Sequence, residues 1–66
     1  MQIQINGQPR EMEGVATVAD LLRVLDIPRE RVAVMLNEMV IPRAKHEDTA
    51  VGEGDVVEIV TMVGGG

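Results

Sequence analysis

The longest apolar stretch of the chain is residues 56–63, which read VVEIVTMV and stand directly before three glycines. This density of β-branched residues favours a strand. Successive side chains of a strand face opposite sides of a sheet. One side then carries Val57, Ile59 and Thr61, and the other carries Val56, Glu58, Val60 and Met62. We expect the first set to point toward a helix and the second set to face outward.

A hairpin is predicted at the other end of the chain. Residues 2–6 alternate between polar and apolar, which is the period of a strand. Asn6-Gly7 follows and favours a two-residue turn, because both residue types tolerate positive φ. Residues 8–13 return as a polar strand that begins with a proline, which favours the edge of a sheet.

A single helix is predicted for residues 18–26. Thr17 is its expected N-cap, with Asp20 in the capping-box position. Apolar residues recur at i, i+3, i+4 and i+7 and form one stripe along the helix. They are Val18, Leu21, Leu22 and Leu25. Pro28 ends the helix, because the residue before a proline is pushed out of the α region.

Two further strands are predicted after the helix. Residues 31–37 are largely apolar, and residues 39–43 form a short strand that ends at a proline. A turn at Asn37-Glu38 separates the two. Residues 44–50 are polar and irregular, so we expect them to form a loop before the last strand.

The order of these elements predicts the fold. One helix can cover only one face of a sheet, and a parallel pairing of the last strand with the first puts the apolar side chains of both under it. The crossovers are long enough for this pairing. We therefore predict an α+β domain of the β-grasp (ubiquitin-like) type, a mixed four- to five-stranded sheet with one main helix packed on one face. The domain is expected to span residues 1–63, followed by a flexible C-terminal glycine tail at residues 64–66.

Composition excludes several classes of function. The 66-residue chain contains no Cys, Ser, Phe, Tyr or Trp, which rules out a disulfide framework, a cysteine zinc site and a serine or cysteine nucleophile. The formal net charge of −5 argues against nucleic acid and against an anionic membrane surface as ligands. No stretch has the pattern of a signal peptide or a membrane span, so we expect a cytoplasmic protein.

Three features could suggest a metal site, a catalytic pair or a phosphate loop, and each is better explained without such a function. His46 is the only histidine and lies in a polar loop, so we expect a solvated side chain and no metal site. Glu11 and Glu13 share one face of an edge strand, where no pocket is available for acid–base catalysis. Gly52 and Gly54 form a turn rather than a phosphate loop, because no Lys-Ser/Thr pair follows them.

The remaining reactive group is the α-carboxylate of Gly66. Gly64 and Gly65 before it have no Cβ atoms, so such a tail can thread a narrow channel in another protein. A carboxylate becomes an electrophile once one of its oxygens is made a leaving group, for example by adenylation with ATP. A frayed end without function is the alternative.

A face for docking partner enzymes is predicted on the outward side of the last strand. Its residues are Val56, Glu58, Val60 and Met62, joined by Ala33 and Met35 or their neighbours. Methionine suits a surface that fits several partners, because it is unbranched and polarizable. The alternative is a set of scattered exposed apolar residues, which are normal on protein surfaces.

Short motifs occur in a fixed order along the whole chain. They are MQIQING at residues 1–7, TVADLL at 17–22, VMLN at 34–37, IPR at 41–43, GDVVEI at 54–59 and the glycines at 65–66. Together they resemble the ThiS family, the sulfur-carrier proteins of thiazole synthesis in the bacterial thiamine pathway. Two features depart from the family pattern: Lys45-His46 replaces a frequent aromatic, and Gly64 stands where other residues occur.

The resemblance implies that an adenylating enzyme related to ubiquitin-activating enzymes uses ATP and magnesium to convert the Gly66 carboxylate into an acyl-adenylate. A cysteine desulfurase persulfide is then the source of the sulfur that forms a thiocarboxylate, and thiazole synthase takes this sulfur. Gly64 and Gly65 would let the tail enter both active sites. The chain itself would be a carrier and no enzyme, with no permanently bound cofactor or metal.

Three other functions stay open at this point. The small-subunit sulfur carrier of molybdopterin synthesis has the same fold and terminal chemistry, although its members tend to be longer and residues 41–43 favour the thiamine branch. A ubiquitin-like modifier would join Gly66 to a lysine amine. A plain β-grasp interaction domain would carry an inert tail.

Overall fold

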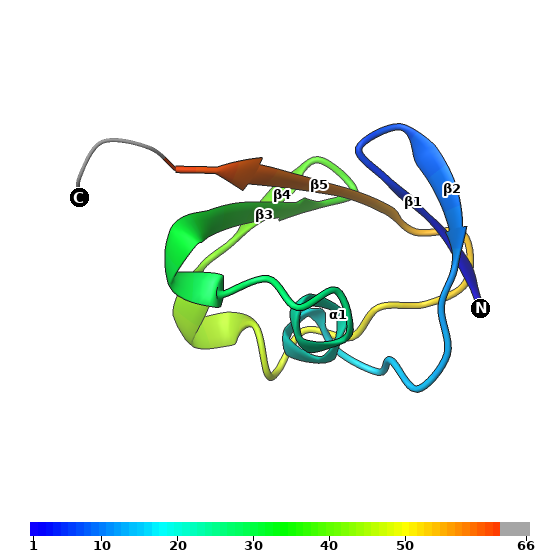
Figure 1. The fold of residues 1–66 in the computed structure, drawn as a ribbon, viewed down its shortest axis with the longest axis horizontal. Helices are drawn as coiled ribbons and strands as arrows, with labels where there is room; N and C mark the ends of the chain where they lie inside the picture. The colour runs from blue at the N-terminus through cyan, green and yellow to red at the C-terminus, as the bar shows by residue number, and fades with distance from the viewer. Residues whose placement is uncertain (63–66) are drawn as a thin grey trace.

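In a computed structural model the chain forms a mixed sheet with one helix packed against one face (Figure 1). The structure describes residues 1–62. Its elements are β1 (Gln2–Ile5), β2 (Gln8–Glu11), α1 (Val18–Val24), β3 (Val32–Leu36), β4 (Met39–Ile41) and β5 (Val56–Thr61), with short 3₁₀ helices at Arg29–Arg31 and Arg43–Lys45. The predicted order of elements is confirmed, and the short strand before the last loop makes the sheet five-stranded.

Several predicted elements end earlier in the structure: β2 at Glu11 rather than residue 13, and β4 at Ile41 rather than residue 43. The helix was expected to run to residue 26, but α1 ends at Val24, because Asp26 adopts a left-handed φ of 59° that no helix can continue. The last strand was expected to reach residue 63, but β5 ends at Thr61. Residue 63 lies outside the described residues.

The strand order is β2-β1-β5-β3-β4. β5 pairs in parallel with β1, with Ile5 opposite Val57, and it pairs antiparallel with β3. The predicted hairpin turn is confirmed, since Asn6 and Gly7 have φ values of 52° and 82°. β5 is therefore the central strand, and the chain reaches it last.

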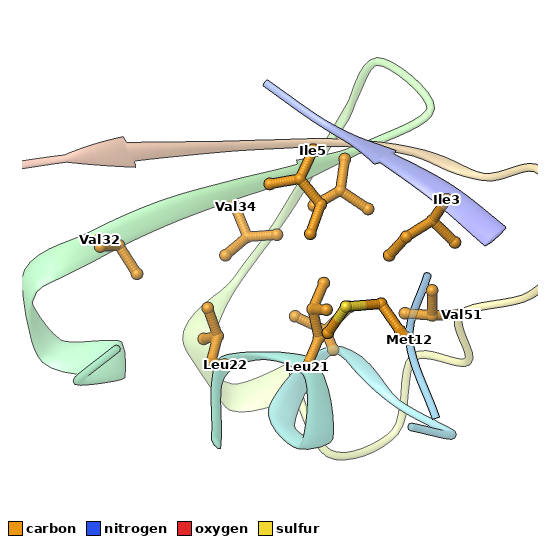
Figure 2. Packing of buried hydrophobic residues seen from close by; sticks show 10 residues of the cluster. Ile3, Ile5, Met12, Leu21, Leu22, Val32, Val34 and Val51 are labelled. Carbon is orange, nitrogen blue, oxygen red and sulfur yellow. The ribbon is translucent and has the colours of Figure 1, made fainter. Parts of the chain in front are cut away.

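The core lies between the sheet and α1, and it is entirely aliphatic. Figure 2 shows Ile3, Ile5 and Val34 pointing from the sheet toward Leu21 and Leu22 on the helix. The predicted stripe on the helix is confirmed, because its three N-terminal members are buried and Leu25 packs against the cluster as a partly buried residue. Because α1 covers only one face of the sheet, the other face remains exposed to solvent and to other proteins.

The start of α1 is fixed by the predicted capping box. The Thr17 hydroxyl accepts a hydrogen bond from the Asp20 N–H at 3.2 Å, and the Asp20 carboxylate accepts one from the Thr17 N–H at 3.2 Å. The same carboxylate accepts from the Ala16 N–H and pairs with Arg23 at 2.7 Å. These bonds, led by the one from Ala16, lower the pKa of Asp20 below its usual value.

Candidate docking face and C-terminal tail

The alternation predicted for the last strand is confirmed. Val57 is fully buried under α1, whereas Val60 on the opposite side is 54% exposed. Val56 and Met62 are exposed on the same side as Val60, and so is Glu58. Ile59 is only partly buried, because it lies near the end of the helix rather than under its centre. The outward residues of β5 are therefore accessible to another protein.

The neighbouring strands extend this surface. The strand register places Ala33 opposite Val60 and Met35 opposite Glu58, and it places Val40 of β4 opposite Met35. The surface, called the open face below, consists of Ala33, Met35, Val40, Val56, Glu58, Val60 and Met62. Glu58 makes no ion pair within residues 1–62, so one unpaired carboxylate lies among apolar side chains.

Two asparagine side chains hold β5 at its flanks, and sequence reasoning missed both. Asn6 donates from Nδ2 to the Ile59 carbonyl at 3.1 Å and accepts from the Ile59 N–H at 2.8 Å. Asn37 accepts from the Val56 N–H at 2.9 Å. Both residues were identified only as turn residues, and no local signal indicates bonds to a strand that begins 19 or more residues later. They fix the strand that carries the predicted docking residues.

The predicted tail residues Gly64, Gly65 and Gly66 lie outside the described residues. The last described residue is Met62, whose N–H donates to the Arg31 carbonyl at 2.8 Å. The chain after β5 thus remains hydrogen-bonded to the residue before β3 as far as Met62. Figure 1 shows that β5 runs away from the N-terminus toward the opposite end of the molecule.

The prediction that His46 is solvated is wrong. Its side chain is 1% exposed, and its Nε2 lies 3.2 Å from the Ile41 carbonyl oxygen. Its own carbonyl accepts a hydrogen bond from the Ala19 N–H at 2.9 Å, in the first turn of α1. The loop therefore turns inward here to satisfy N–H groups that a helix start leaves without a partner. His46 Nδ1 has no hydrogen-bond partner among residues 1–62.

Replacing His46 with alanine should destabilise the domain by about 2–4 kcal/mol, because a cavity forms and the bond to Ile41 is lost. Urea unfolding followed by circular dichroism measures the change. The control is Lys45→Ala, which truncates an exposed neighbour and should change stability by less than about 0.5 kcal/mol. Equal stability of the two variants would contradict the structural role of His46.

The other motif-like groups have ordinary structural roles. Glu11 accepts from the N-terminal amine of Met1 at 2.7 Å, and this bond raises the pKa of that amine. The turn at Gly52 and Gly54 is confirmed, with the Gly52 N–H donating to Asp55 Oδ2 at 2.7 Å. Residues 1–62 contain no cluster of three or more His, Asp or Glu side chains suited to a metal. None of the helices described is long and apolar enough to cross a membrane.

A five-stranded mixed sheet in the order β2-β1-β5-β3-β4, crossed by one helix, defines the class as β-grasp. The model of the ThiS family matches residues 3–66, and the chain belongs to this family. It is 36% identical to the sulfur carrier protein ThiS of Thermus thermophilus, over 97% of this chain and 98% of that protein. Members of this family are sulfur carriers and not catalysts.

Two further relatives bear on fold and partner. The crystal structure of the thiamine biosynthesis protein ThiS from Geobacter metallireducens superposes with a TM-score of 0.86 at 36% identity, covering all of both chains. A thiazole synthase of Paramagnetospirillum magneticum is 38% identical over the whole of this chain, which corresponds to 20% of its own length. That protein therefore contains a segment similar to this chain.

Proposed function

We propose that this chain carries sulfur on the carboxylate of Gly66 for thiazole formation in thiamine biosynthesis. The observation that supports this most is that all 66 residues, the terminal glycines included, align with part of a thiazole synthase. The full-length similarity to a sulfur carrier protein supports the same function. The side chains also agree, because the sequence has no cysteine on which sulfur could be carried.

The proposed chemistry begins with activation of the terminal carboxylate. A carboxylate oxygen of Gly66 attacks the α-phosphorus of magnesium-bound ATP in an adenylating enzyme, and pyrophosphate leaves. The terminal sulfur of a persulfide, made by a cysteine desulfurase, attacks the acyl carbon and expels AMP. The product is an acyl disulfide; a thiol then attacks its outer sulfur and breaks the S–S bond, which leaves a thiocarboxylate on Gly66 and a disulfide between the thiol and the desulfurase cysteine. Each covalent intermediate replaces one difficult displacement at the carboxylate with two easier ones.

The proposed contribution of this chain is delivery rather than catalysis. Gly64 and Gly65 have no side chains that could collide with the walls of a narrow channel, and they can adopt conformations closed to other residues. The folded domain would remain outside the channel and bind the enzyme through a separate surface. The affinity for the enzyme then comes from the folded domain, and the tail carries the terminal carboxylate to the active site.

The open face is the surface that we assign to partner enzymes, with Val56, Glu58, Val60 and Met62 as its predicted centre. It is apolar, accessible and continuous across β4, β3 and β5. Thiazole synthase is the partner with independent support, because a relative carries a similar segment within the same polypeptide. The adenylating enzyme is the second partner that the chemistry requires.

Intact-mass spectrometry tests the proposed function. The purified chain is incubated with the adenylating enzyme of its own organism, ATP, magnesium, cysteine, cysteine desulfurase and a thiol. We expect a mass gain equal to the replacement of one oxygen by one sulfur, dependent on ATP. An unchanged mass with active partners would overturn the proposal, and a stable adduct to a lysine of another protein would identify a modifier instead.

Charging the open face should weaken enzyme binding without unfolding the domain. We expect Val60→Asp and Met62→Asp each to raise the Kd for the adenylating enzyme at least about tenfold, because a buried carboxylate at an interface loses its hydration. Isothermal titration calorimetry measures the change. Val24→Asp is the matched control, since Val24 on α1 is 54% exposed, as Val60 is. If Val24→Asp weakens binding as much as Val60→Asp does, the assignment of the face is wrong.

A further inference from the structure

β5 extends beyond the strand that pairs with it on one side. The ladder with β1 ends where Ile5 lies opposite Val57, and the side chain of Asn6 then satisfies both backbone groups of Ile59. β1 turns away at this point, while β5 continues toward its end (Figure 1). Within the described part of the chain, the side of β5 that faced β1 is therefore uncovered at residues 60–62.

The backbone of Thr61 points to this uncovered side. Met62 donates its N–H to Arg31, which lies on the β3 side, and backbone groups of successive residues in a strand point in opposite directions. Thr61 lies opposite Val32 in the ladder, at a position where this alternation directs its N–H and C=O away from β3. The ladder with β3 therefore does not use these two groups, and no hydrogen bond outside the ladders is made by either of them within residues 1–62. Such groups form a template for another strand.

A groove lies beside this edge on the helix side of the sheet. Its volume is about 370 Å³, and it is lined in part by Leu25, Ile27 and Ile59, which are partly buried. Arg10 also lines the groove and makes no ion pair within the described part of the chain. The edge of β5 thus combines main-chain hydrogen-bonding groups, an apolar pocket and an unpaired positive charge.

We propose that an extended segment of thiazole synthase adds to this edge as a further strand. Its main chain pairs with the N–H and C=O of Thr61, one of its apolar side chains enters the groove, and a carboxylate of the segment pairs with Arg10. Strand addition draws its affinity from main-chain bonds and its specificity from pockets for alternate side chains. This inference rests on the proposed function, in which thiazole synthase must hold the tail of this chain.

Two observations favour thiazole synthase over other occupants. The uncovered edge at Thr61 comes shortly before the glycine tail in the sequence, and the proposed function requires thiazole synthase to bind that tail. A segment similar to this chain occurs within a thiazole synthase polypeptide. A second copy of this chain fits less well, because residues 59–62 contain no carboxylate that could pair with Arg10.

Thr61→Pro tests the main-chain pairing. Proline removes the N–H of residue 61, which has no acceptor among residues 1–62, and proline is tolerated at an uncovered strand edge. We expect the Kd for the thiazole synthase of the same organism to rise at least about tenfold, measured by calorimetry. Thr61→Val is the control, because it keeps the N–H and the β-branched shape, and its Kd should stay within about twofold of wild type.

Two further measurements keep the inference testable if the proline variant misfolds. Arg10→Gln should weaken binding about three- to tenfold, whereas Arg43→Gln, which removes the same charge away from this groove, should not. Amide hydrogen exchange followed by NMR should show a Thr61 amide that exchanges rapidly in the free chain and becomes protected in the complex.

The outcomes separate the inference from the proposed function. Tight binding of wild type, with no change in Arg10→Gln and no protection of the Thr61 amide, would overturn strand addition and leave the carrier function intact. Protection of that amide in the free chain at high concentration, together with a dimer in sedimentation, would replace the enzyme segment with a second copy. A wild-type chain that neither binds thiazole synthase nor gains sulfur would overturn both proposals.

Discussion

Deletion of Gly66 should abolish formation of the thiocarboxylate while leaving the domain folded. One residue of extended chain spans about 3.3–3.6 Å, so the new terminal carboxylate of Gly65 would stop that far short of the α-phosphorus. Misplacement of a reacting group by about 1 Å can reduce a rate by about 10²-fold. We therefore expect the rate of the ATP-dependent mass gain to fall by at least that factor. The far-ultraviolet circular dichroism spectrum should match that of wild type, which shows that the domain is still folded.

Two matched variants show whether this loss comes from the position of the carboxylate. One extra glycine after Gly66 should fail as completely as the deletion, because the carboxylate is then displaced in the other direction. Gly64→Ala should have a smaller effect, since the family resemblance places other residues at this position. A truncated chain that still gains sulfur at the normal rate would show that the terminal carboxylate of Gly66 is not the carrier group.

Leu21→Ala should leave the domain largely unfolded at room temperature. Leu21 is 0% exposed and lies in the centre of the core cluster shown in Figure 2. Truncation of a buried leucine costs about 2–5 kcal/mol. The core of a domain this small rarely supplies more than about 3–5 kcal/mol of net stability, so one such cavity removes most of it. Circular dichroism and the dispersion of the NMR amide signals measure the outcome.

The control for Leu21→Ala is Val24→Ala on the same helix. Val24 is more than half exposed, and alanine has the higher helix propensity, so stability should change by less than about 0.5 kcal/mol. A folded Leu21→Ala variant with a sharp thermal transition close to that of wild type would show that the aliphatic core is not what holds this sheet and helix together.

Much of the fold could be predicted because its elements have strong local patterns. The alternation of residues 2–6, the Asn6-Gly7 turn and the capping box at Thr17 each depend on residues within a few positions of one another. The parallel pairing of β5 with β1 followed from one global argument, that a single helix covers a single face of the sheet. The structure confirms all four features.

The docking residues on the last strand could be predicted from the same local alternation, but the residues beside them on neighbouring strands could not. Val56, Val60 and Met62 could be assigned to the outer face from strand period alone. Val40 joins them only because the short strand β4 pairs in register with Met35. A register between two strands depends on both strands and on their turn, so a pattern within one of them cannot determine it.

The sequence by itself determined the order of the elements and the two faces of the last strand, whereas the role of the Gly66 carboxylate stays a prediction. Only the tertiary structure decided that His46 is buried beneath the start of α1, that Asn6 holds β5, and that Thr61 has an uncovered edge. The physical reason is distance along the chain. Asn6 and Ile59 are 53 residues apart, and hydrogen bonds between such residues leave no periodic signal in either segment.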